Sequence, residues 1–123
     1  MSDIVLNKVL LYGDPKKIQE LREFMRSDVS AFDLNKLSDK PRKQRESNAV
    51  WKTDYLVEFH TNNTCPVFDF RKITKRFPDV GLEVSFANKD GSYSGTIDYY
   101  RNEFDLGYLN SETFASYVWN TND

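Results

Sequence analysis

Five stretches of the chain have the hydrophobic patterns of β-strands: four alternate hydrophobic with polar positions, and the first is apolar at most positions. The five stretches are 4–12, 31–37, 50–61, 80–86 and 93–99. In the first stretch both faces are largely apolar, which predicts a central strand covered on both sides. In the third stretch Trp51, Tyr55 and Phe59 share one face with other apolar residues, and mostly polar residues share the opposite face. We therefore expect a strand with one buried and one wetter face.

Three helices are predicted beside these strands. Asp14 and Pro15 form a helix start, because an aspartate caps the free amides and proline at the first helical position loses no hydrogen bond. Apolar residues at helical spacing continue this helix to about residue 27. A second helix opens at Pro66 and stops at Pro78, and a short amphipathic helix follows Ser111. The polar segment 38–48 between the second and third strands is predicted to be a loop.

The predicted order of elements is strand, helix, strand, strand, helix, strand, then one further strand and a terminal helix. The first six elements give the βαββαβ pattern of a ferredoxin-like split βαβ sandwich, which belongs to the α+β class. We expect one such domain at residues 1–100, including a C-terminal hairpin, and a tail at 101–123 whose helix packs on the same domain. Helices cover one sheet face in this fold, so the tail or a second copy of the chain would close the other face.

Length and charge restrict the possible classes of protein. The chain has 123 residues, of which 39% are hydrophobic and 29% charged, and this is sufficient for one domain with a core. The net charge of -2 argues against broad non-specific binding to DNA or membrane surfaces. The sequence shows no transmembrane run and no signal peptide, and its single cysteine, Cys65, fits a reducing compartment. We therefore expect a cytoplasmic protein that does not act at membranes.

Four short motifs lie in order along the chain. They are Asn7-x-Val9-x-Leu11-x-Gly13, Phe32-x-Leu34-Asn35-Lys36-Leu37, Phe59-x-Thr61 followed by Pro66, and Lys75-Arg76-Phe77-Pro78-Asp79. In order and spacing they resemble the YubB-type ferredoxin-like domain family, small proteins of phages, prophages and plasmids, over residues 4–100. The resemblance implies the fold expected above and a protein from a mobile element in the cytoplasm of its host cell. The family carries no agreed catalytic residues, so the resemblance implies no active site.

The residues that could carry catalysis are few or scattered. His60 is the only histidine, and Cys65 follows five residues later. We interpret them as a surface histidine and a half-buried cysteine rather than a nucleophile–base pair, and two such ligands are too few for a usual zinc site. Carboxylates cluster loosely at Asp98, Glu103 and Asp105, as is typical of solvated strand ends. The sequence predicts no catalytic residues, no metal and no cofactor.

Charge is distributed unevenly, and this predicts candidate binding residues. The segment 36–52 is basic, and its candidate binding residues are Lys40, Arg42, Lys43, Arg45 and Lys52. The balance reverses in 98–123, where the candidate acidic patch is Asp98, Glu103 and Asp105. Two tryptophans, Trp51 and Trp119, are candidate anchors for a partner if they are exposed. The alternative interpretation of the basic segment is a solvated loop without a binding role.

Three hypotheses for the function follow. The leading one is a non-catalytic protein-binding module of a phage or other mobile element. It would inhibit a host defence or nucleic-acid-processing complex, such as a CRISPR effector, by occupying its surface. The second is a nucleic-acid-binding accessory protein that uses the basic loop 36–52. The third is a binder or hydrolase of a small nucleotide, with Asp98 and Glu103 as the first candidates. The chain is expected to act as a monomer or a homodimer.

Overall fold

The computed structural model describes residues 3–40 and 43–120 of the chain. The predicted α+β class is confirmed, since these residues form a six-stranded antiparallel sheet, three α-helices and one short 3-10 helix. The elements in chain order are β1 (Ile4–Tyr12), α1 (Pro15–Met25), η1 (Leu34–Leu37), β2 (Glu46–Trp51), β3 (Leu56–Asn62), α2 (Val67–Arg76), β4 (Gly81–Asn88), β5 (Ser94–Tyr100), β6 (Glu103–Tyr108) and α3 (Glu112–Asn120).

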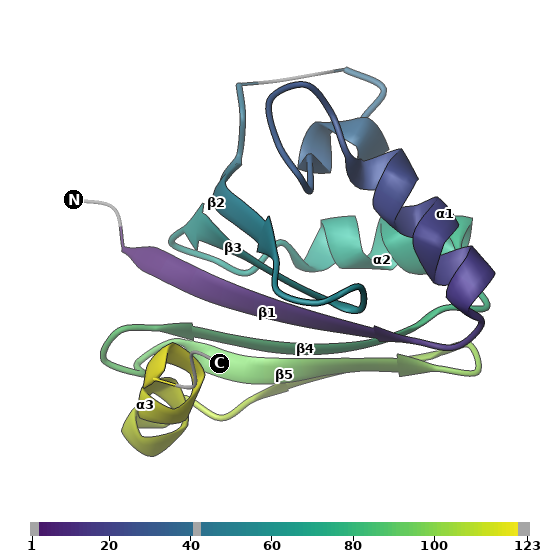
Figure 1. The fold of residues 1–123 in the computed structure, drawn as a ribbon. Helices are drawn as coiled ribbons and strands as arrows, with labels where there is room; N and C mark the ends of the chain where they lie inside the picture. Colours follow the sequence, from purple (N-terminus) through teal and green to yellow (C-terminus); the bar gives the residue numbers. More distant parts are fainter. Residues whose placement is uncertain (1–2, 41–42, 121–123) are drawn as a thin grey trace.

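The strands lie in the order β2-β3-β1-β4-β5-β6, and every neighbouring pair is antiparallel. Helices α1 and α2 cover one face of this sheet, whereas α3 lies on the opposite face near the N-terminal end of β1 (Figure 1). We call the face toward α1 and α2 the inner face and the other the outer face. Strand β1 lies in the interior of the sheet, as its two apolar faces predict.

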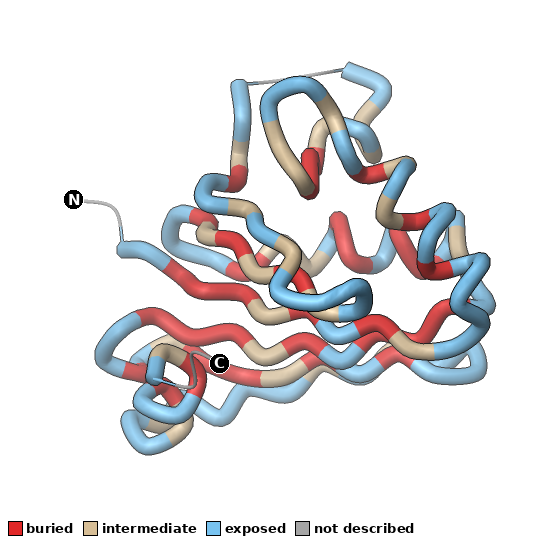
Figure 2. The backbone as a smooth tube through the Cα atoms, in the orientation of Figure 1, coloured by how far each residue is buried: buried red, intermediate tan, exposed pale blue. Residues whose placement is uncertain are grey.

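The main hydrophobic core fills the space between the inner face and the two helices. Its largest fully buried side chains include Phe32, Phe59, Phe70 and Phe86, and burial of each such side chain stabilises the fold by about 1.5–3 kcal/mol. Figure 2 shows buried segments along the central strands and on the sides of α1 and α2 that meet the sheet. The alternation along each strand therefore decides which residues enter this core and which reach the outer face.

A smaller apolar cluster holds α3 on the outer face. Ala115 and Val118 of this helix pack against Leu6 of β1 and Ala87 of β4. The helix begins where Ser111 predicts, because the Ser111 hydroxyl accepts a hydrogen bond of 3.1 Å from the Phe114 amide. The terminal helix thus covers one end of the outer face and leaves the other end open.

The predicted strand at 31–37 is wrong. Residues 34–37 form the 3-10 helix η1, and the Asp33 carboxylate accepts a hydrogen bond of 2.9 Å from the Asn35 amide at its start. The Leu34 amide donates to the buried Glu46 carboxylate over 3.0 Å. Local capping by two carboxylates therefore outweighs the short alternation in this segment. Glu46 also begins β2, so the loop predicted over 38–48 ends earlier than expected.

The long strand predicted at 50–61 is a hairpin. Strands β2 and β3 meet at a turn over 52–55, where the Thr53 hydroxyl accepts hydrogen bonds of 3.0 Å from the amides of Tyr55 and Leu56. Such a side-chain bond to the following backbone favours a turn over an extended strand. As a result Trp51 and Val57 lie opposite each other on neighbouring strands, where the sequence pattern suggests successive positions of one strand.

The segment after residue 100, expected to hold only a tail helix, contributes strand β6 as well. Arg101 and Asn102 both have positive φ, at 50° and 69°, and form a two-residue turn between β5 and β6. Positive φ at both central residues is the geometry of a tight hairpin. The element order therefore differs from the prediction by one additional strand. No α-helix in the described part of the chain is long and apolar enough to cross a membrane.

Candidate binding surface

A row of carboxylates crosses three neighbouring strands on the outer face. The sheet register places Glu83 of β4 opposite Asp98 of β5, and Asp98 opposite Asp105 of β6. All three residues are exposed, and none forms an ion pair with a described residue. Directly opposed side chains in an antiparallel sheet have Cβ atoms about 4.5–5.5 Å apart, and like charges there are destabilising. The row is therefore a local electrostatic cost to the folded state.

The row continues into an apolar and aromatic end of the same face. Leu10 of β1 lies opposite Glu83, and Tyr12 lies opposite Gly81 at the start of β4. A Cβ atom at position 81 would run into the Tyr12 ring, so glycine leaves the space that this ring occupies. Tyr100 packs beside Tyr12 with ring centroids 5.9 Å apart. The Tyr12 hydroxyl donates a hydrogen bond of 3.1 Å to the Tyr99 carbonyl, which fixes the ring in place.

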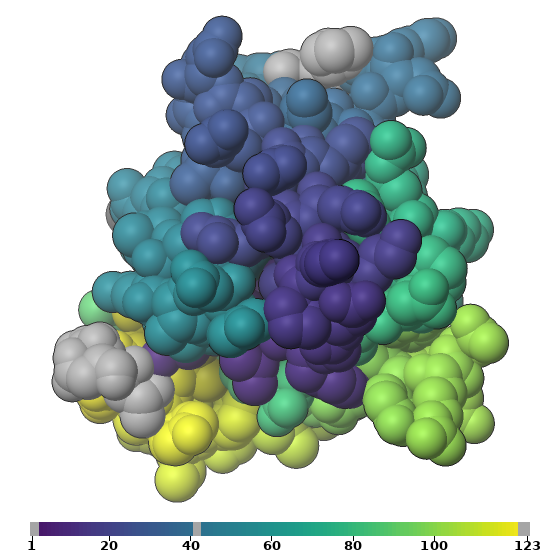
Figure 3. All heavy atoms as spheres, turned by 45° about the vertical axis from the view of Figure 1, so that its right-hand side comes forward, coloured from purple at the N-terminus to yellow at the C-terminus, as the bar shows by residue number. Residues whose placement is uncertain are grey.

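Two hollows adjoin at Tyr12. The first, of about 290 Å³, lies between the ends of β1 and β5, and its lining includes Tyr12, Tyr100 and Arg101. The second, of about 310 Å³, lies between β1 and the start of α1, and its lining includes Leu10, Tyr12 and Tyr55. In Figure 3 the purple atoms of the end of β1 and the start of α1 lie between teal atoms of the β2–β3 turn and yellow-green atoms of the β5–β6 turn. The hollows thus form an uneven surface at one end of the sheet.

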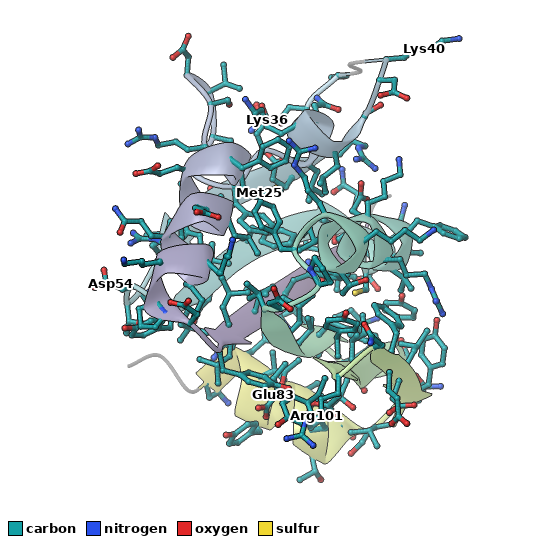
Figure 4. All side chains as sticks on the ribbon, turned by 90° about the vertical axis from the view of Figure 1, so that its right-hand side faces the viewer. Met25, Lys36, Lys40, Asp54, Glu83 and Arg101 are labelled. Atoms are coloured by element: carbon teal, nitrogen blue, oxygen red, sulfur yellow. The ribbon has the colours of Figure 1, made fainter. Side chains whose placement is uncertain are left out.

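Electrostatics link this end to the carboxylate row. Burial raises the pKa of Tyr12 above its ordinary value, and the negative charges of Asp98 and Glu83 raise it further. The Arg101 guanidinium lies 4.9 Å from the Tyr100 ring centroid and stacks on that ring. Figure 4 labels Glu83 and Arg101 at the end of the sheet that faces the viewer. We define the tyrosine–acid surface as Leu10, Tyr12, Tyr55, Glu83, Asp98 and Tyr100.

The predicted acidic patch is only partly the same surface. Asp98 and Asp105 are brought together as cross-strand neighbours, and Glu103 lies two residues before Asp105 on the same side of β6. Sequence reasoning missed Glu83, because the register that places it beside Asp98 is set by strand pairing. It also missed Tyr12, Tyr55 and Tyr100 as a group. Tyr12 and Tyr100 lie at the ends of β1 and β5 and Tyr55 lies in the β2–β3 turn, and the sequence gives no signal of their convergence.

The predicted basic loop has two kinds of side chain. Arg45 forms two hydrogen bonds with the buried Asp69 carboxylate, of 2.6 Å from Nη2 and 3.0 Å from Nη1, and therefore connects the segment just before β2 to α2. Lys40, Lys43 and Lys52 are exposed. Arg42 lies outside the described residues. Lys40 is labelled in Figure 4 at the opposite end of the molecule from Glu83 and Arg101, so this lysine lies far from the carboxylate row.

The two predicted anchor tryptophans are half-buried and hold parts of the fold together. The Trp51 indole donates a hydrogen bond of 3.2 Å to the Ala31 carbonyl, and the Arg22 guanidinium stacks 4.6 Å from its ring. The Trp119 indole donates to the Ala87 carbonyl over 3.0 Å and packs on the His60 ring at 5.6 Å. Each tryptophan therefore has an internal role that explains its position without a partner.

His60 and Cys65 lie on opposite sides of the sheet. His60 contacts Trp119 of α3 on the outer face, whereas Cys65 is buried in the main core. Burial raises the pKa of the Cys65 thiol well above its ordinary value, so the thiolate is disfavoured. Burial lowers the pKa of His60. Among residues 3–40 and 43–120, no group of three or more histidine, cysteine or acidic side chains is arranged to hold a metal ion.

Comparisons of the chain with protein-family models, curated proteins and solved structures found no match.

Proposed function

We propose that the protein is a non-catalytic protein-binding module whose contact surface is the tyrosine–acid surface. The observation that carries this proposal is the meeting of two hollows at Tyr12, beside a row of carboxylates without ion-pair partners among the described residues. Hollows accept side chains from a partner, and uncompensated charge gives a reason for the partner to be of opposite sign.

The composition of the surface supports contact with a protein. Exposed fractions are 39% for Leu10, 42% for Tyr55 and 51% for Tyr100, so a continuous apolar and aromatic area faces solvent. Tyrosine is enriched at protein interfaces, because its rigid ring buries a large area at a small entropy cost and its hydroxyl bonds polar groups. A binding partner would cover the rings and compete with water for the carboxylates at their edge.

The charge distribution indicates a basic partner. Residues 80–123 carry seven acidic and two basic side chains, whereas residues 1–79 carry 12 acidic and 15 basic side chains. Strands β4, β5 and β6, which hold Glu83, Asp98 and Asp105, belong to this acidic part of the chain and therefore attract cationic surfaces over a range of about 8–10 Å at ordinary ionic strength. We expect a partner that presents lysine or arginine next to apolar residues.

We also propose that β1, α1, β2, β3, α2 and β4 form a ferredoxin-like unit. In support, these four strands lie in the order β4-β1-β3-β2, all antiparallel, with α1 and α2 on one face. Strands β5 and β6 and helix α3 are then additions at one edge and on the outer face. The kinship with the YubB-type family, and with it the inhibition of a host defence complex, stays a prediction from the sequence.

A two-step binding experiment tests the proposed function. A tagged protein is first used to capture partners from a bacterial lysate treated with nuclease, and the captured partner is identified by mass spectrometry and purified. Its affinity is then measured for the wild type, for Tyr100→Ala and Asp98→Lys, and for Lys72→Glu on the exposed side of α2 as the control.

We expect Tyr100→Ala and Asp98→Lys each to weaken binding at least about tenfold, which corresponds to about 1.4 kcal/mol, and the control to bind as the wild type does. Circular dichroism and thermal unfolding verify that each variant folds. Equal affinity of all four proteins would refute the proposed surface. Capture that disappears after nuclease treatment would refute protein binding as the function.

Nucleic-acid binding is the second candidate function, and the exposed lysines favour it. Lys40, Lys43 and Lys52 are exposed in or beside the basic loop, and Lys72 and Lys75 are exposed on α2. Binding of this kind would weaken steeply as salt concentration rises, because phosphate contacts release counterions. The double variant Lys40→Glu/Lys43→Glu would then lose affinity for RNA or DNA. An affinity that does not change with salt, or with this variant, would exclude the basic loop as a nucleic-acid site.

A further inference from the structure

Strand β6 is an edge of the sheet with a regular backbone. It pairs with β5 over all six of its residues, without a break in register, and no strand of the described residues lies on its other side. The opposite edge, β2, differs, because its register shifts between Ser47 and Val50 and Asn48 has a φ of 55°. A bulge of this kind blunts an edge against further pairing. The described sheet therefore has one irregular edge and one that can accept another strand.

The two sides of β6 present different chemistry. Glu103 and Asp105 are exposed on the outer side, where Asp105 ends the row of carboxylates that begins at Glu83. Phe104 and Leu106 lie on the inner side and pack against the main core, while Tyr108 on the same side is 54% exposed. A strand added beside β6 would meet carboxylates on the outer side. On the inner side it would meet Leu106, the Tyr108 ring and the Phe104 ring, on which the Arg71 guanidinium of α2 stacks at 4.2 Å. Alternate basic and apolar residues satisfy both sides, because successive side chains of a strand point to opposite faces.

Gly107 gives a second, independent indication. A Cβ atom at this position would meet no atom within 4 Å, and its φ is not positive. Neither packing nor backbone geometry within the fold therefore requires glycine in this strand, although glycine weakens a strand interior. Absence of a side chain at 107 leaves the outer side of β6 open between the edge and β5. A long basic side chain from an added strand can lie across this space toward Asp98.

We infer that the partner adds an extended segment to the β6 edge, with basic residues facing Glu103 and Asp105 and apolar residues facing Phe104, Leu106 and Tyr108. Main-chain hydrogen bonds supply affinity in such strand addition, and the alternating side chains supply specificity. This inference rests on the proposed function, since the same basic partner would cover the tyrosine–acid surface next to β5. Beyond the proposed function, it specifies that the bound segment of the partner is an extended strand in which basic and apolar residues alternate.

A second copy of the chain fits this edge poorly. A two-fold axis normal to the sheet would pair β6 with β6 in the antiparallel sense and keep the outer sides together. Glu103 and Asp105 of the two copies would then lie across from one another, and directly opposed like charges destabilise a strand pair. The carboxylates thus disfavour self-pairing and favour a cationic segment, as charged residues commonly do at natural edges.

Short peptides test the inference without the unidentified partner. The probe is an eight-residue peptide of alternating lysine and valine with blocked ends. Its controls are a peptide of the same composition with four lysines followed by four valines, and an alternating peptide methylated at every second backbone nitrogen. Binding is followed by NMR titration and by hydrogen exchange of the backbone amides of the intact protein.

We expect the alternating peptide to shift the resonances of residues 103–108 and to slow exchange of amides in β6. Both controls should bind at least tenfold more weakly. Asp105→Lys should also reduce the affinity at least tenfold, whereas Asp28→Asn, an exposed carboxylate after α1, should not change it. The inference is overturned if the peptide of four lysines followed by four valines binds as tightly as the alternating peptide. It is also overturned if Asp105→Lys does not reduce the affinity, or if the shifted resonances belong to residues away from β6.

The two proposals fail separately. Tyr100→Ala leaves the β6 edge intact, so it should weaken capture of the protein partner but not binding of the peptide. If the alternating peptide does not bind but Tyr100→Ala still weakens binding of the captured partner, strand addition is overturned and the proposed function stands. If the peptide binds but the captured partner has the same affinity for Tyr100→Ala and Asp98→Lys as for the wild type, only the proposed function is overturned.

Discussion

Neutralising Asp98 is expected to stabilise the fold, although the substitution removes a charged group from the surface. Asp98 faces a carboxylate on each side, Glu83 on β4 and Asp105 on β6, whereas Asp105 faces only Asp98. Opposite charges directly across two strands stabilise a sheet by about 0.2–1 kcal/mol and like charges destabilise it, so we assign each like-charge pair a cost of the same size, about 0.2–1 kcal/mol. Two unit charges about 5 Å apart in water repel by about 0.8 kcal/mol, which agrees with this range.

The structure therefore predicts an order among the variants. Asp98→Asn removes two repulsions and should raise the free energy of unfolding by about 0.4–2 kcal/mol, while Asp105→Asn removes one and should raise it by about 0.2–1 kcal/mol. Asp28→Asn is the matched control, because this exposed residue lies in the loop after α1, outside the carboxylate row, and forms no ion pair among the described residues. It should change the free energy by less than about 0.5 kcal/mol.

Urea unfolding at two salt concentrations measures the effect. In low salt both stabilisations should be present, and in 1 M salt, where the screening length is about 3 Å, both should shrink toward zero. A gain for Asp105→Asn that exceeds the gain for Asp98→Asn would contradict the register argument. A loss of stability for Asp98→Asn in low salt would show that this carboxylate has a stabilising partner, and the account of the row would be wrong.

Three further predictions concern other parts of the chain. Arg45→Met leaves the buried Asp69 without its cation and should destabilise the fold by about 3 kcal/mol. This value is at the lower end of the range for breaking a buried ion pair, because the Arg45 side chain is 32% exposed. A double-mutant cycle with Asp69→Asn measures the coupling energy between the two side chains. Burial lowers the pKa of His60, and the Glu58 charge partly offsets this. The stability that neutral His60 contributes is therefore fully present above about pH 6.5 and is lost as pH falls through the lowered pKa. In His60→Gln the unfolding temperature should depend less on pH over that window. Gly107→Ala should raise the free energy of unfolding by about 0.4–1 kcal/mol, because no atom lies where the added methyl group would go and alanine reduces the conformational freedom of the unfolded chain. A lower free energy of unfolding for this variant, measured by denaturant titration, would indicate a constraint on residue 107.

Most of the architecture could be predicted from local sequence patterns. Asp14 and Pro15 start α1 as expected, with the Asp14 carboxylate accepting a hydrogen bond of 2.9 Å from the Lys16 amide. The stretch 4–12, apolar on both faces, matches β1 residue for residue. Patterns of this kind report burial on one or two faces, and burial is what the core imposes.

The errors have a shared physical origin, because polar side-chain hydrogen bonds and turn conformations decided the local backbone. Asp33 and Glu46 cap η1 where the alternation suggests a strand, and the Thr53 hydroxyl turns the chain where the alternation continues. The turn before β6 uses Arg101 and Asn102 with positive φ, in place of the Asn-Gly or Asp-Gly pairs that usually mark such turns. Hydrophobic periodicity carries no information on these hydrogen bonds.

The candidate surface was less predictable than the fold, since it depends on register. Asp98 and Asp105 are seven residues apart in the chain, but Glu83 is fifteen residues from Asp98, and only strand pairing makes them neighbours. Arg45 shows the opposite case, because sequence reasoning counted it among the residues free to bind, whereas it is engaged with Asp69. Charge counts along a sequence therefore predict polarity but not which charges are available.

Neutralising Asp98 should raise the free energy of unfolding and lower the affinity for the partner. These opposite effects distinguish a binding surface from an incidental row of charges. If the carboxylates serve a basic partner, Asp98→Asn should unfold at higher denaturant concentration and bind the captured partner more weakly. If the row has no role, the variant should gain stability and keep full affinity, because removal of repulsion would then be its only effect. A folded state that retains three opposed carboxylates at a cost of about 0.2–1 kcal/mol per pair fits the trade of stability for function seen at binding sites. Parallel measurement of both quantities on Asp98→Asn and Asp105→Asn therefore tests the stability argument and the proposed function at once.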